Sequence, residues 1–595
     1  MGRVLYHLLS CVLGSFRTED TSPSSSLSPL DWWQNTLIYQ VYPRSFKDSD
    51  GDGIGDLNGI TEKLDYIQDL GVDTVWIQPF FKSPMDDMGY DVQDFKAVDP
   101  LFGTMEDFKR LLKGIKERGM KVILDFVVNH TSDQCEWFQL SEQGVEPYRD
   151  YYVWRDAKKF NDTHKTYPNN WSSMFHGTAW QWSEMRKQYY LHQFSVQQPD
   201  LNYRNPRVVK EMESIMRFWL DMGVDGFRLD APKHMFESEH FLDEPDIKGT
   251  FGWPARIYTT RLPETFAQIR AWRALLDEYT AKDGQARILC TEDYEVPTML
   301  KDYLGDAAHP GAQIPFYFLL VFSDRKANAT KLNQIIQDLV TVFPRSAWNW
   351  VTDNHDNWRV SSRFSKEAVD AFNMLNLLLP GSASVYQGSE LAMHDIPVRP
   401  DQRQDPLNGG PGRADSRDAH RAPMPWDSSR NAGFTKARKP WLPVHPSYWT
   451  SNVEIQKDDP DSHLNTFKRI VALRKTPVVR LGDLKTYTPK DWVFMFTRSL
   501  KDETIVVLLN IGSETEDVCV KDVAPKLPDE MFVRVKSIGS MYDVGKKLKL
   551  GPGSHGSKCI EMRPQSGLVL STSHGAAISF SLFMLLLTIV STMIS

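Results

Sequence analysis

Short apolar runs alternate with amphipathic stretches from Trp32 onward, and this pattern predicts parallel βα units. A helical pattern from Met105 to Arg118, for example, leads directly into the apolar run that begins at Val122. The expected buried strands are the runs 37–42, 74–77, 122–128, 226–229, 287–290, 346–351 and 384–386. Seven or eight such units predict an α/β fold, a closed (β/α)8 TIM barrel.

Two regions depart from this repeat. About eighty residues rich in Trp, Tyr, Asn and His separate Val128 from the helix that begins at Val208, which predicts a subdomain inserted after the third strand. From about Thr486, alternating strands replace the βα pattern and predict a C-terminal antiparallel β-sandwich domain. We expect the barrel over 31–130 and 204–485, the inserted subdomain over 131–203 and the β-sandwich domain over 486–565.

The N-terminal residues have the character of a secretory signal peptide. Arg3 precedes the apolar run Val4 to Leu13, which is too short to span a bilayer and is followed by small residues. We expect a signal peptide over 1–16 and a flexible polar segment over 17–30.

The C-terminal residues Ala576 to Ile594 are apolar and carry no formal charge. A stop-transfer helix usually has basic residues on its cytoplasmic side, and here only Ser595 follows. We expect a GPI-anchor signal over 566–595, with Ser571-Thr572-Ser573 or Ser566-Gly567 as the attachment site; a true membrane span is the alternative. The expected location is the extracellular face of the plasma membrane.

Cysteine and asparagine positions agree with secretion. Cys519 and Cys559 lie in the same C-terminal region and are expected to form a disulfide, whereas Cys135 and Cys290 are expected to be free. The plausible glycan sites are Asn161, Asn170 and Asn328. The Asn129 sequon lies in an active-site motif, so we expect it to be unmodified.

Composition places the chain among globular proteins and limits its partners. It has 595 residues, of which 41% are hydrophobic, and its net charge is −8. Because there is no long basic run, a nucleic-acid partner is not expected. The 18 tryptophans suit both an aromatic carbohydrate site and a large core.

Acids and imidazoles recur where the predicted strands end. A barrel places its chemistry at the C-terminal ends of its strands, so folding would gather these residues into one ring. The stretches are Asp125-Phe126-Val127-Val128-Asn129-His130, Gly226-Phe227-Arg228-Leu229-Asp230, Thr291-Glu292 and Asn354-His355-Asp356. Taken alone, each could be a helix cap or a structural ion pair, and an isolated Arg228-x-Asp230 favours the ion pair. Four together favour a catalytic site.

Two carboxylates on either side of a glycosidic bond are the equipment of a glycoside hydrolase. Arg228 and Asp230 point the same way along their strand, so the arginine would hold the carboxylate ionised for nucleophilic attack. Glu292 follows an apolar strand, and partial burial would raise its pKa toward that of a general acid. Spacing alone does not assign these roles.

The four stretches resemble the signature regions of the α-amylase family (glycoside hydrolase family 13), and the resemblance extends over about Asp31 to Arg563. Gln198-Pro199-Asp200-Leu201-Asn202 is similar to the oligo-1,6-glucosidase and maltase branch. Further matching stretches are Met88-Gly89-Tyr90-Asp91, Ser416-Arg417-Asp418 and Arg421-Ala422-Pro423-Met424-Pro425-Trp426-Asp427. Within this branch the chain looks most like the GPI-anchored maltases of insects, known from mosquito midgut.

The resemblance implies roles for individual residues. Asp230 matches the nucleophile, Glu292 the general acid/base, and Asp356 the third acid, which binds sugar hydroxyls. Residues that match sugar-binding positions are Asp87, Tyr90, His130, Arg228, His355 and Arg417. The implied mechanism is retaining, with the carboxyls of the first two acids about 5–5.5 Å apart.

Two positions depart from the family pattern. Maltases often have Ala-Val after the nucleophile, whereas this chain has Ala231-Pro232, and the second position influences the choice between α-1,4 and α-1,6 links. The linkage preference is therefore open. The third-acid motif usually begins with Gly, and here Asp353 takes that place.

An acidic loop is a candidate calcium site. It resembles an EF-hand loop in its alternating acids but has Gly59 at the twelfth position, so it is not an EF-hand. The same loop binds structural calcium in bacterial and insect relatives, and the alternative is a solvated acidic turn. The expected Ca²⁺ ligands are Asp48, Asp50, Asp52, the Ile54 carbonyl and Asp56.

The residues and the resemblance together predict an α-glucosidase that removes terminal α-glucose from maltose, sucrose or short malto-oligosaccharides. The competing class is a non-catalytic, amylase-like surface protein, such as a receptor or the heavy chain of an amino-acid transporter. Anchored maltases of this type also serve as receptors for bacterial binary toxins, so toxin binding is a further expectation. The sequence leaves the oligomeric state open between a monomer and a homodimer.

Overall fold

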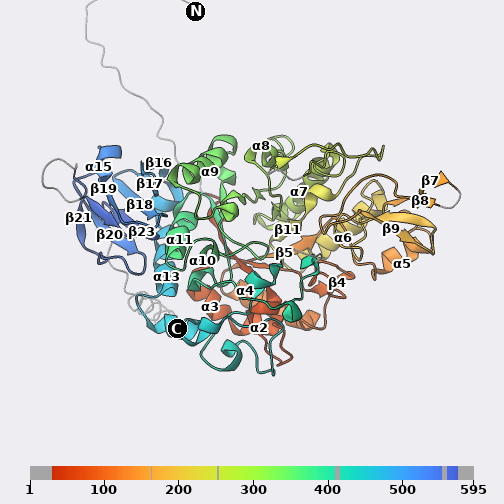
Figure 1. Cartoon of the computed structure of the whole chain (residues 1–595), viewed down its shortest axis with the longest axis horizontal. Coiled ribbons are helices and arrows are strands. Elements are labelled where there is room, and N and C mark those ends of the chain that lie inside the picture. Colours follow the sequence, from red (N-terminus) through yellow and green to blue (C-terminus); the bar gives the residue numbers. More distant parts are fainter. Residues whose placement is uncertain (1–29, 162–163, 251–253, 409–415, 552–558, 574–595) are drawn as a thin grey trace, which may run out of the picture.

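The barrel is a sheet of eight parallel strands that runs through the middle of the molecule (Figure 1). The order of neighbours is β13-β12-β11-β5-β2-β1-β15-β14. The strands are β1 Leu37–Val41, β2 Thr74–Ile77, β5 Lys121–Val127, β11 Gly226–Asp230, β12 Ile288–Thr291, β13 Ile314–Pro315, β14 Asn349–Val351 and β15 Ser382–Tyr386. This confirms the predicted barrel.

A side chain closes the barrel where the two end strands, β13 and β14, meet. The Asn349 side chain in β14 accepts a hydrogen bond from the Tyr317 backbone N–H at 2.8 Å. It also donates from Nδ2 to the Pro315 carbonyl at 2.8 Å. One amide therefore replaces the ladder that a short strand containing a proline cannot supply.

This is a computed structural model, and it describes residues 30–161, 164–250, 254–408, 416–551 and 559–573. The predicted signal peptide (1–16), most of the N-terminal segment 17–30, and the apolar tail 576–594 lie outside the described residues. Within the described part, no helix combines the length and apolar composition needed to cross a bilayer.

Amphipathic helices cover the barrel. Helix α4 shows why they form: Thr104 caps its first turn in reciprocal hydrogen bonds with Asp107, and its inward face buries Phe108, Leu111 and Ile115. Between Leu57 and Asp69 the helix is broken at Lys63. The longer helices are α2 Leu57–Glu62, α3 Leu64–Asp69, α4 Met105–Glu117, α6 Pro206–Asp221, α7 Pro263–Asp283, α9 Ala329–Val342, α11 Ala368–Leu378, α12 Val453–Asp458 and α13 His463–Arg474.

The inserted subdomain projects from the barrel beyond β5 (Figure 1, right). It contains its own core around the stacked Trp171 and Trp180, and it is fastened to the barrel by backbone bridges such as His130 with Asp200. Its elements are α5 Glu136–Glu142, β6 Trp154–Arg155, β7 Lys158–Asn161, β8 His164–Thr166, β9 Trp180–Ser183 and β10 Gln188–Leu191.

The C-terminal domain is an antiparallel sheet of order β16-β17-β18-β23-β20-β21, with β19 and β22 paired beside it. The Cys519–Cys559 disulfide forms within it. Its strands are β16 Asp483–Lys490, β17 Val493–Leu500, β18 Glu503–Asn510, β19 Glu516–Val518, β20 Glu530–Lys536, β21 Lys547–Lys549, β22 Ile560–Met562 and β23 Ser566–Ser571.

The limits of this domain differ from the predicted range 486–565. Strand β16 begins at Asp483, and the buried strand β23 lies between β18 and β20 and packs on α11 (Figure 1). The expected anchor signal 566–595 therefore overlaps the domain. Its candidate attachment site Ser566-Gly567 lies inside the sheet. Strand β23 was not predicted, because its apolar run lies among polar residues.

Candidate active site

The three predicted catalytic acids lie at the same end of the barrel. Asp230 is the last residue of β11, Glu292 directly follows β12, and Asp356 lies in the turn after β14. Parallel strands bring their carboxyl ends together at one rim, which is where barrel enzymes carry their chemistry. The structure thus brings together residues that are more than sixty positions apart in the sequence.

The guanidinium of Arg228 lies at the centre of this arrangement. Its Nη1 is 2.7 Å from Asp125 Oδ1 and 2.5 Å from Asp230 Oδ1, and its Nη2 is 2.8 Å from Glu292 Oε2. The Arg228 side chain is 1% exposed. One buried cation therefore links three carboxylates, where the sequence predicted only its pair with Asp230.

Burial gives the two central acids different pKa values. Burial raises the pKa of Asp230 to about 6, and the Arg228 charge opposes that rise. Burial raises the pKa of Glu292 to about 8, again opposed by Arg228. Between these values Asp230 is ionised and Glu292 is protonated, which are the states that a nucleophile and a general acid require.

Asp356 behaves differently because it lies against two arginines and the imidazole of His355. Burial raises its pKa, but the nearby His355, Arg421 and Arg417 outweigh burial and hold the pKa below its ordinary value. Arg421 Nη2 lies 2.7 Å from Asp356 Oδ1, and Arg417 Nη1 lies 3.3 Å from the same oxygen. Asp356 is therefore a permanent carboxylate, suited to binding hydroxyl groups.

Tyr90 and His355 form one wall of the site. Their rings stack with centroids 5.6 Å apart, and the Tyr90 hydroxyl lies 2.8 Å from His355 Nε2. The same hydroxyl donates to Asp125 Oδ2 at 3.1 Å, and Gln40 Nε2 lies 2.9 Å from His355 Nδ1. These contacts fix the imidazole that lies beside Asp356.

His130 belongs to the same wall. Its Nε2 lies 3.2 Å from the carbonyl oxygen of Tyr90, and its ring packs 5.0 Å from that of Phe194. Burial lowers the pKa of His130 to about 3, so it is a neutral hydrogen-bonding group.

A second ion-pair network holds the predicted sugar-binding residues Asp87 and Arg417. Arg417 Nη2 lies 2.8 Å from Asp87 Oδ1 and 2.7 Å from Asp405 Oδ1, and Arg417 Nε contacts both Asp405 oxygens. Gln198, from the Gln-Pro-Asp-Leu-Asn stretch, donates to Asp87 Oδ2 at 3.1 Å. The network joins the loop after β2, the inserted subdomain and the segment after β15.

Three residues of the site were not assigned roles from the sequence. Asp125 is the first residue of the stretch 125–130, and Arg421 is the first residue of the stretch 421–427. Their positions in these family motifs could have indicated both. Asp405 lies in an irregular segment without any motif, and only the fold shows that it binds Arg417.

The acidic loop brings three of the predicted calcium ligands together. Carboxylate oxygens of Asp48, Asp50 and Asp56 lie within 4.8 Å of one another. Asp48 and Asp56 are buried, with no basic side chain paired to them in the described part of the chain, so a cation fits there. Asp52 is not part of this cluster. Its carboxylate accepts from the Ile54 backbone N–H at 2.7 Å, and the three cluster aspartates likewise accept backbone N–H groups of the loop.

The predicted glycan sites have different surroundings. Asn170 is exposed but hydrogen-bonded to the Glu244 backbone through both ends of its amide. Asn328 is partly exposed and caps α9 by accepting from the Lys331 N–H, which leaves its Nδ2 without a partner in the described structure. The side chain of Asn161 lies outside the described residues.

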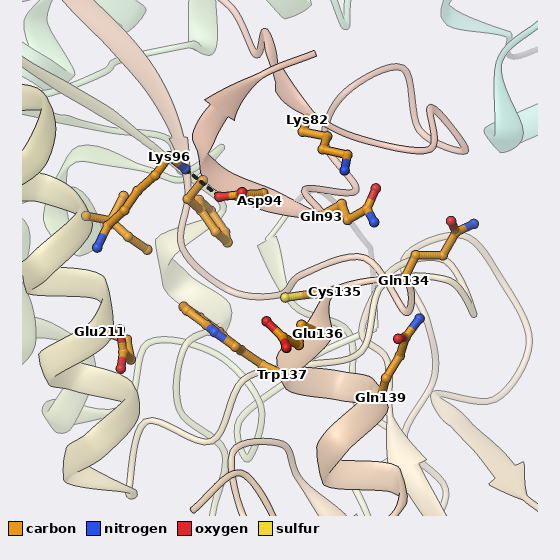
Figure 2. A pocket seen from close by; sticks show the side chains of 12 residues that line it. Lys82, Gln93, Asp94, Lys96, Gln134, Cys135, Glu136, Trp137, Gln139 and Glu211 are labelled. Atoms are coloured by element: carbon orange, nitrogen blue, oxygen red, sulfur yellow. Dashed lines mark hydrogen bonds between the residues drawn. The ribbon is translucent and has the colours of Figure 1, made fainter. Parts of the chain in front are cut away.

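A separate cavity of about 560 Å³ lies between β4 (Asp94–Val98), α5 and α6 (Figure 2). The charged and amide side chains around it, including Lys82 and Glu136, are surface residues, and Trp137 packs against Phe95 beside them. Burial raises the pKa of the free Cys135 thiol in its wall, so that cysteine is unreactive. The cavity holds none of the catalytic acids.

The chain matches known proteins over most of its length. The α-amylase catalytic-domain model matches residues 40–482. A salivary α-glucosidase of Anopheles gambiae is 41% identical over 93% of this chain and 95% of its own, and maltase A1 of Drosophila melanogaster is 42% identical over 87% and 94%.

Two other similarities bear on function. An amino-acid transporter heavy chain of Homo sapiens is 38% identical over 88% of this chain and 77% of its own. The crystal structure of an α-glucosyl transfer enzyme has a TM-score of 0.79 and 34% identity, covering 91% of this chain and 100% of the other. From the barrel, the site and these similarities together, the chain belongs to the α-amylase family.

Proposed function

We propose that this chain is a retaining α-glucosidase that hydrolyses terminal α-glucose from maltose, sucrose or short malto-oligosaccharides. The observation that carries the proposal is the buried guanidinium of Arg228 shared by Asp230 and Glu292. It places an ionised carboxylate and a protonated one next to each other, which is the arrangement that a double-displacement glycosidase needs. The names of the insect relatives support the same activity.

In the first step, Asp230 attacks the anomeric carbon while the bond to the glycosidic oxygen breaks and Glu292 protonates that oxygen. The product is a β-glucosyl ester on Asp230. Esterification removes the Asp230 charge, so the charge of Arg228 acts more strongly on Glu292 and lowers its pKa. Glu292 then deprotonates the attacking water, which releases α-glucose.

The residues around the reacting carbon bind the glucose. Asp356, held ionised by Arg421 and Arg417, accepts hydrogen bonds from hydroxyl groups. The Asp87–Arg417 pair lies beside Asp356 and offers both an acceptor and a donor to the hydroxyls of a terminal glucose.

The competing function is that of a non-catalytic surface protein, and the similarity to a transporter heavy chain makes it a concrete alternative. The complete set of acids, each with the partner that sets its ionisation, favours the enzyme.

Attachment to the outer cell surface through a GPI anchor is part of the proposal. Because β23 is an inner strand of the C-terminal sheet and ends at Ser571, attachment at Thr572 or Ser573 fits better than at Ser566-Gly567. Release by phosphatidylinositol-specific phospholipase C tests the anchor. Binding of labelled bacterial binary toxin to the purified ectodomain tests the receptor role.

The activity is tested with purified wild-type protein and Asp230→Asn. We expect the wild type to hydrolyse maltose and the variant to be inactive with an unchanged melting temperature. NMR of the first-formed product should show α-glucose. Appreciable maltose hydrolysis by the variant would sink the assignment of Asp230, and initial β-glucose would show an inverting enzyme.

A further inference from the structure

Asp293, the residue directly after Glu292, has a fully buried carboxylate with three partners. Its Oδ1 lies 2.9 Å from Lys233 Nζ, and its Oδ2 accepts from the Tyr303 hydroxyl at 3.1 Å. Arg261 Nη1 lies 3.4 Å from the same Oδ2. Because a buried charge is costly unless paired, these contacts fix the position of Asp293 firmly.

The partners of Asp293 come from different segments of the barrel rim. Lys233 lies three positions after Asp230, in the short helix η2 Pro232–His234. The Arg261 backbone N–H donates to the Lys233 carbonyl at 2.8 Å, and the Arg261 side chain also pairs with Glu295 at 3.0 Å. The Lys233–Asp293 pair therefore ties the loop that follows the nucleophile to the loop that carries the acid.

The same two segments also meet at Glu292 itself. The Ala231 backbone N–H donates to Glu292 Oε2 at 3.1 Å, and the Glu292 N–H donates to the Leu229 carbonyl at 3.2 Å. Glu292 is thus held between a contact to its carboxylate and an ion pair on the next residue. Proton transfer requires the acid to lie within hydrogen-bond reach of the leaving oxygen. Small movements of this loop therefore lower the rate of proton transfer.

We propose that Asp293 is a positioning residue, whose ion pair with Lys233 holds the acid Glu292 at its working place relative to Asp230. The inference rests on the proposed glucosidase function and deepens it. The competing explanation is that the pair only stabilises the rim of the barrel. The two differ in the first step, which kcat/KM reports: there the position of the acid matters only to substrates whose leaving group must be protonated.

The test therefore compares two substrates with the variant Asp293→Asn, which keeps the shape and removes the charge. Maltose needs a proton on its leaving glucose, whereas α-glucosyl fluoride leaves as fluoride with little acid assistance. We expect kcat/KM on maltose to fall on the order of 10²-fold, within the range that general acid catalysis contributes. On the fluoride the value should fall by less than about threefold. Glu292→Gln calibrates the full loss of acid catalysis on both substrates.

Asp225→Asn is the matched control. Asp225 is also buried and paired with two lysines, Lys116 and Lys121, but it precedes β11 at the opposite end of the barrel. The variant Asp225→Asn should lower the melting temperature without changing the ratio of kcat/KM on maltose to kcat/KM on α-glucosyl fluoride.

An equal loss on both substrates in Asp293→Asn would overturn the inference, because it indicates a purely structural pair. If that variant does not fold, Lys233→Met breaks the same ion pair and must show the same substrate dependence. Wild-type protein that hydrolyses neither substrate would instead overturn the proposed function, and this inference with it.

Discussion

Arg228 Nη2 lies 2.8 Å from Glu292 Oε2, so the cation that keeps the nucleophile ionised also touches the acid. The charge on Asp230 consequently determines how strongly Arg228 acts on Glu292. Through this contact a single fixed cation lets Glu292 serve as an acid in the first step and as a base in the second.

The pH dependence of activity follows from this arrangement. Burial raises the pKa of Asp230 to about 6, and Asp230 must be ionised to attack, so activity should rise as pH increases through about 6. Burial raises the pKa of Glu292 to about 8, and Glu292 must be protonated to act as an acid, so activity should fall as pH increases through about 8. We expect a bell-shaped plot of kcat/KM on maltose with its maximum between these values.

The variant Glu292→Gln separates the two limbs. The substrate here is α-glucosyl fluoride, which needs little acid assistance. In a plot of kcat/KM against pH, Glu292→Gln should keep the acidic limb and lose the alkaline one. An alkaline limb that persists unchanged in this variant would show that Glu292 is not the group that titrates there.

The Arg417–Asp405 pair predicts an effect from a residue that no motif marks. Asp405 is fully buried and contacts Arg417 at Nε and Nη2. Arg417 also pairs with Asp356 through its Nη1. Asp405→Asn should leave Arg417 free to shift, and we expect kcat/KM on maltose to fall by about 10- to 100-fold, or roughly 1.4–2.7 kcal/mol. Asp401→Asn, in the exposed pair with Arg399 nearby, is the control and should have no effect. Equal kinetics in the two variants would contradict this role of Asp405.

The sequence was sufficient for the barrel and for most of the catalytic set because both depend on local patterns. Runs such as Thr74–Ile77 are buried throughout, and each acid stands at the end of such a run or within a few residues of it. Strand β13 was not predicted because it has only two residues, Ile314 and Pro315, and its pairing with β14 depends on the side chain of Asn349.

The remaining site residues depend on contacts between distant segments, which a local pattern does not contain. Asp405 and Asp87 meet at Arg417 across more than 300 positions of sequence. Likewise, the alternation of acids predicts Asp52 as a calcium ligand, whereas in the structure only the carboxylates of Asp48, Asp50 and Asp56 cluster.

Pro232 predicts a change in linkage preference. Ala231 has a left-handed backbone (φ 45°, ψ 40°) although it precedes a proline, which favours extended backbone, and its N–H contacts Glu292. Pro232→Val removes this restriction and restores the pair that is common in maltases. We expect the ratio of kcat/KM on maltose to that on isomaltose to rise severalfold. Turnover on both sugars measures it, and an unchanged ratio would show that position 232 does not set the linkage.

The acidic loop predicts stabilisation by Ca²⁺. The buried carboxylates of Asp48 and Asp56 repel each other unless a cation lies between them, so added Ca²⁺ should raise the melting temperature and EDTA should lower it. Asp48→Asn should abolish the difference between the two conditions. Asp306→Asn, an exposed carboxylate elsewhere, is the control. A melting temperature that does not depend on Ca²⁺ in the wild type would mean that the loop is a solvated turn.

The position of β23 predicts how far the chain can be shortened. The strand pairs with both β18 and β20, and it buries Leu568, Val569 and Leu570 completely or nearly so. Burial of three such side chains contributes about 5–9 kcal/mol, which is comparable to the whole stability of many domains. A chain that ends at residue 573 should therefore fold and melt cooperatively, whereas one that ends at 565 should be poorly soluble and lack a cooperative melt, although both keep the Cys519–Cys559 disulfide. Secreted yield and circular dichroism melts distinguish them, and equal melting temperatures would show that β23 is dispensable to the sheet.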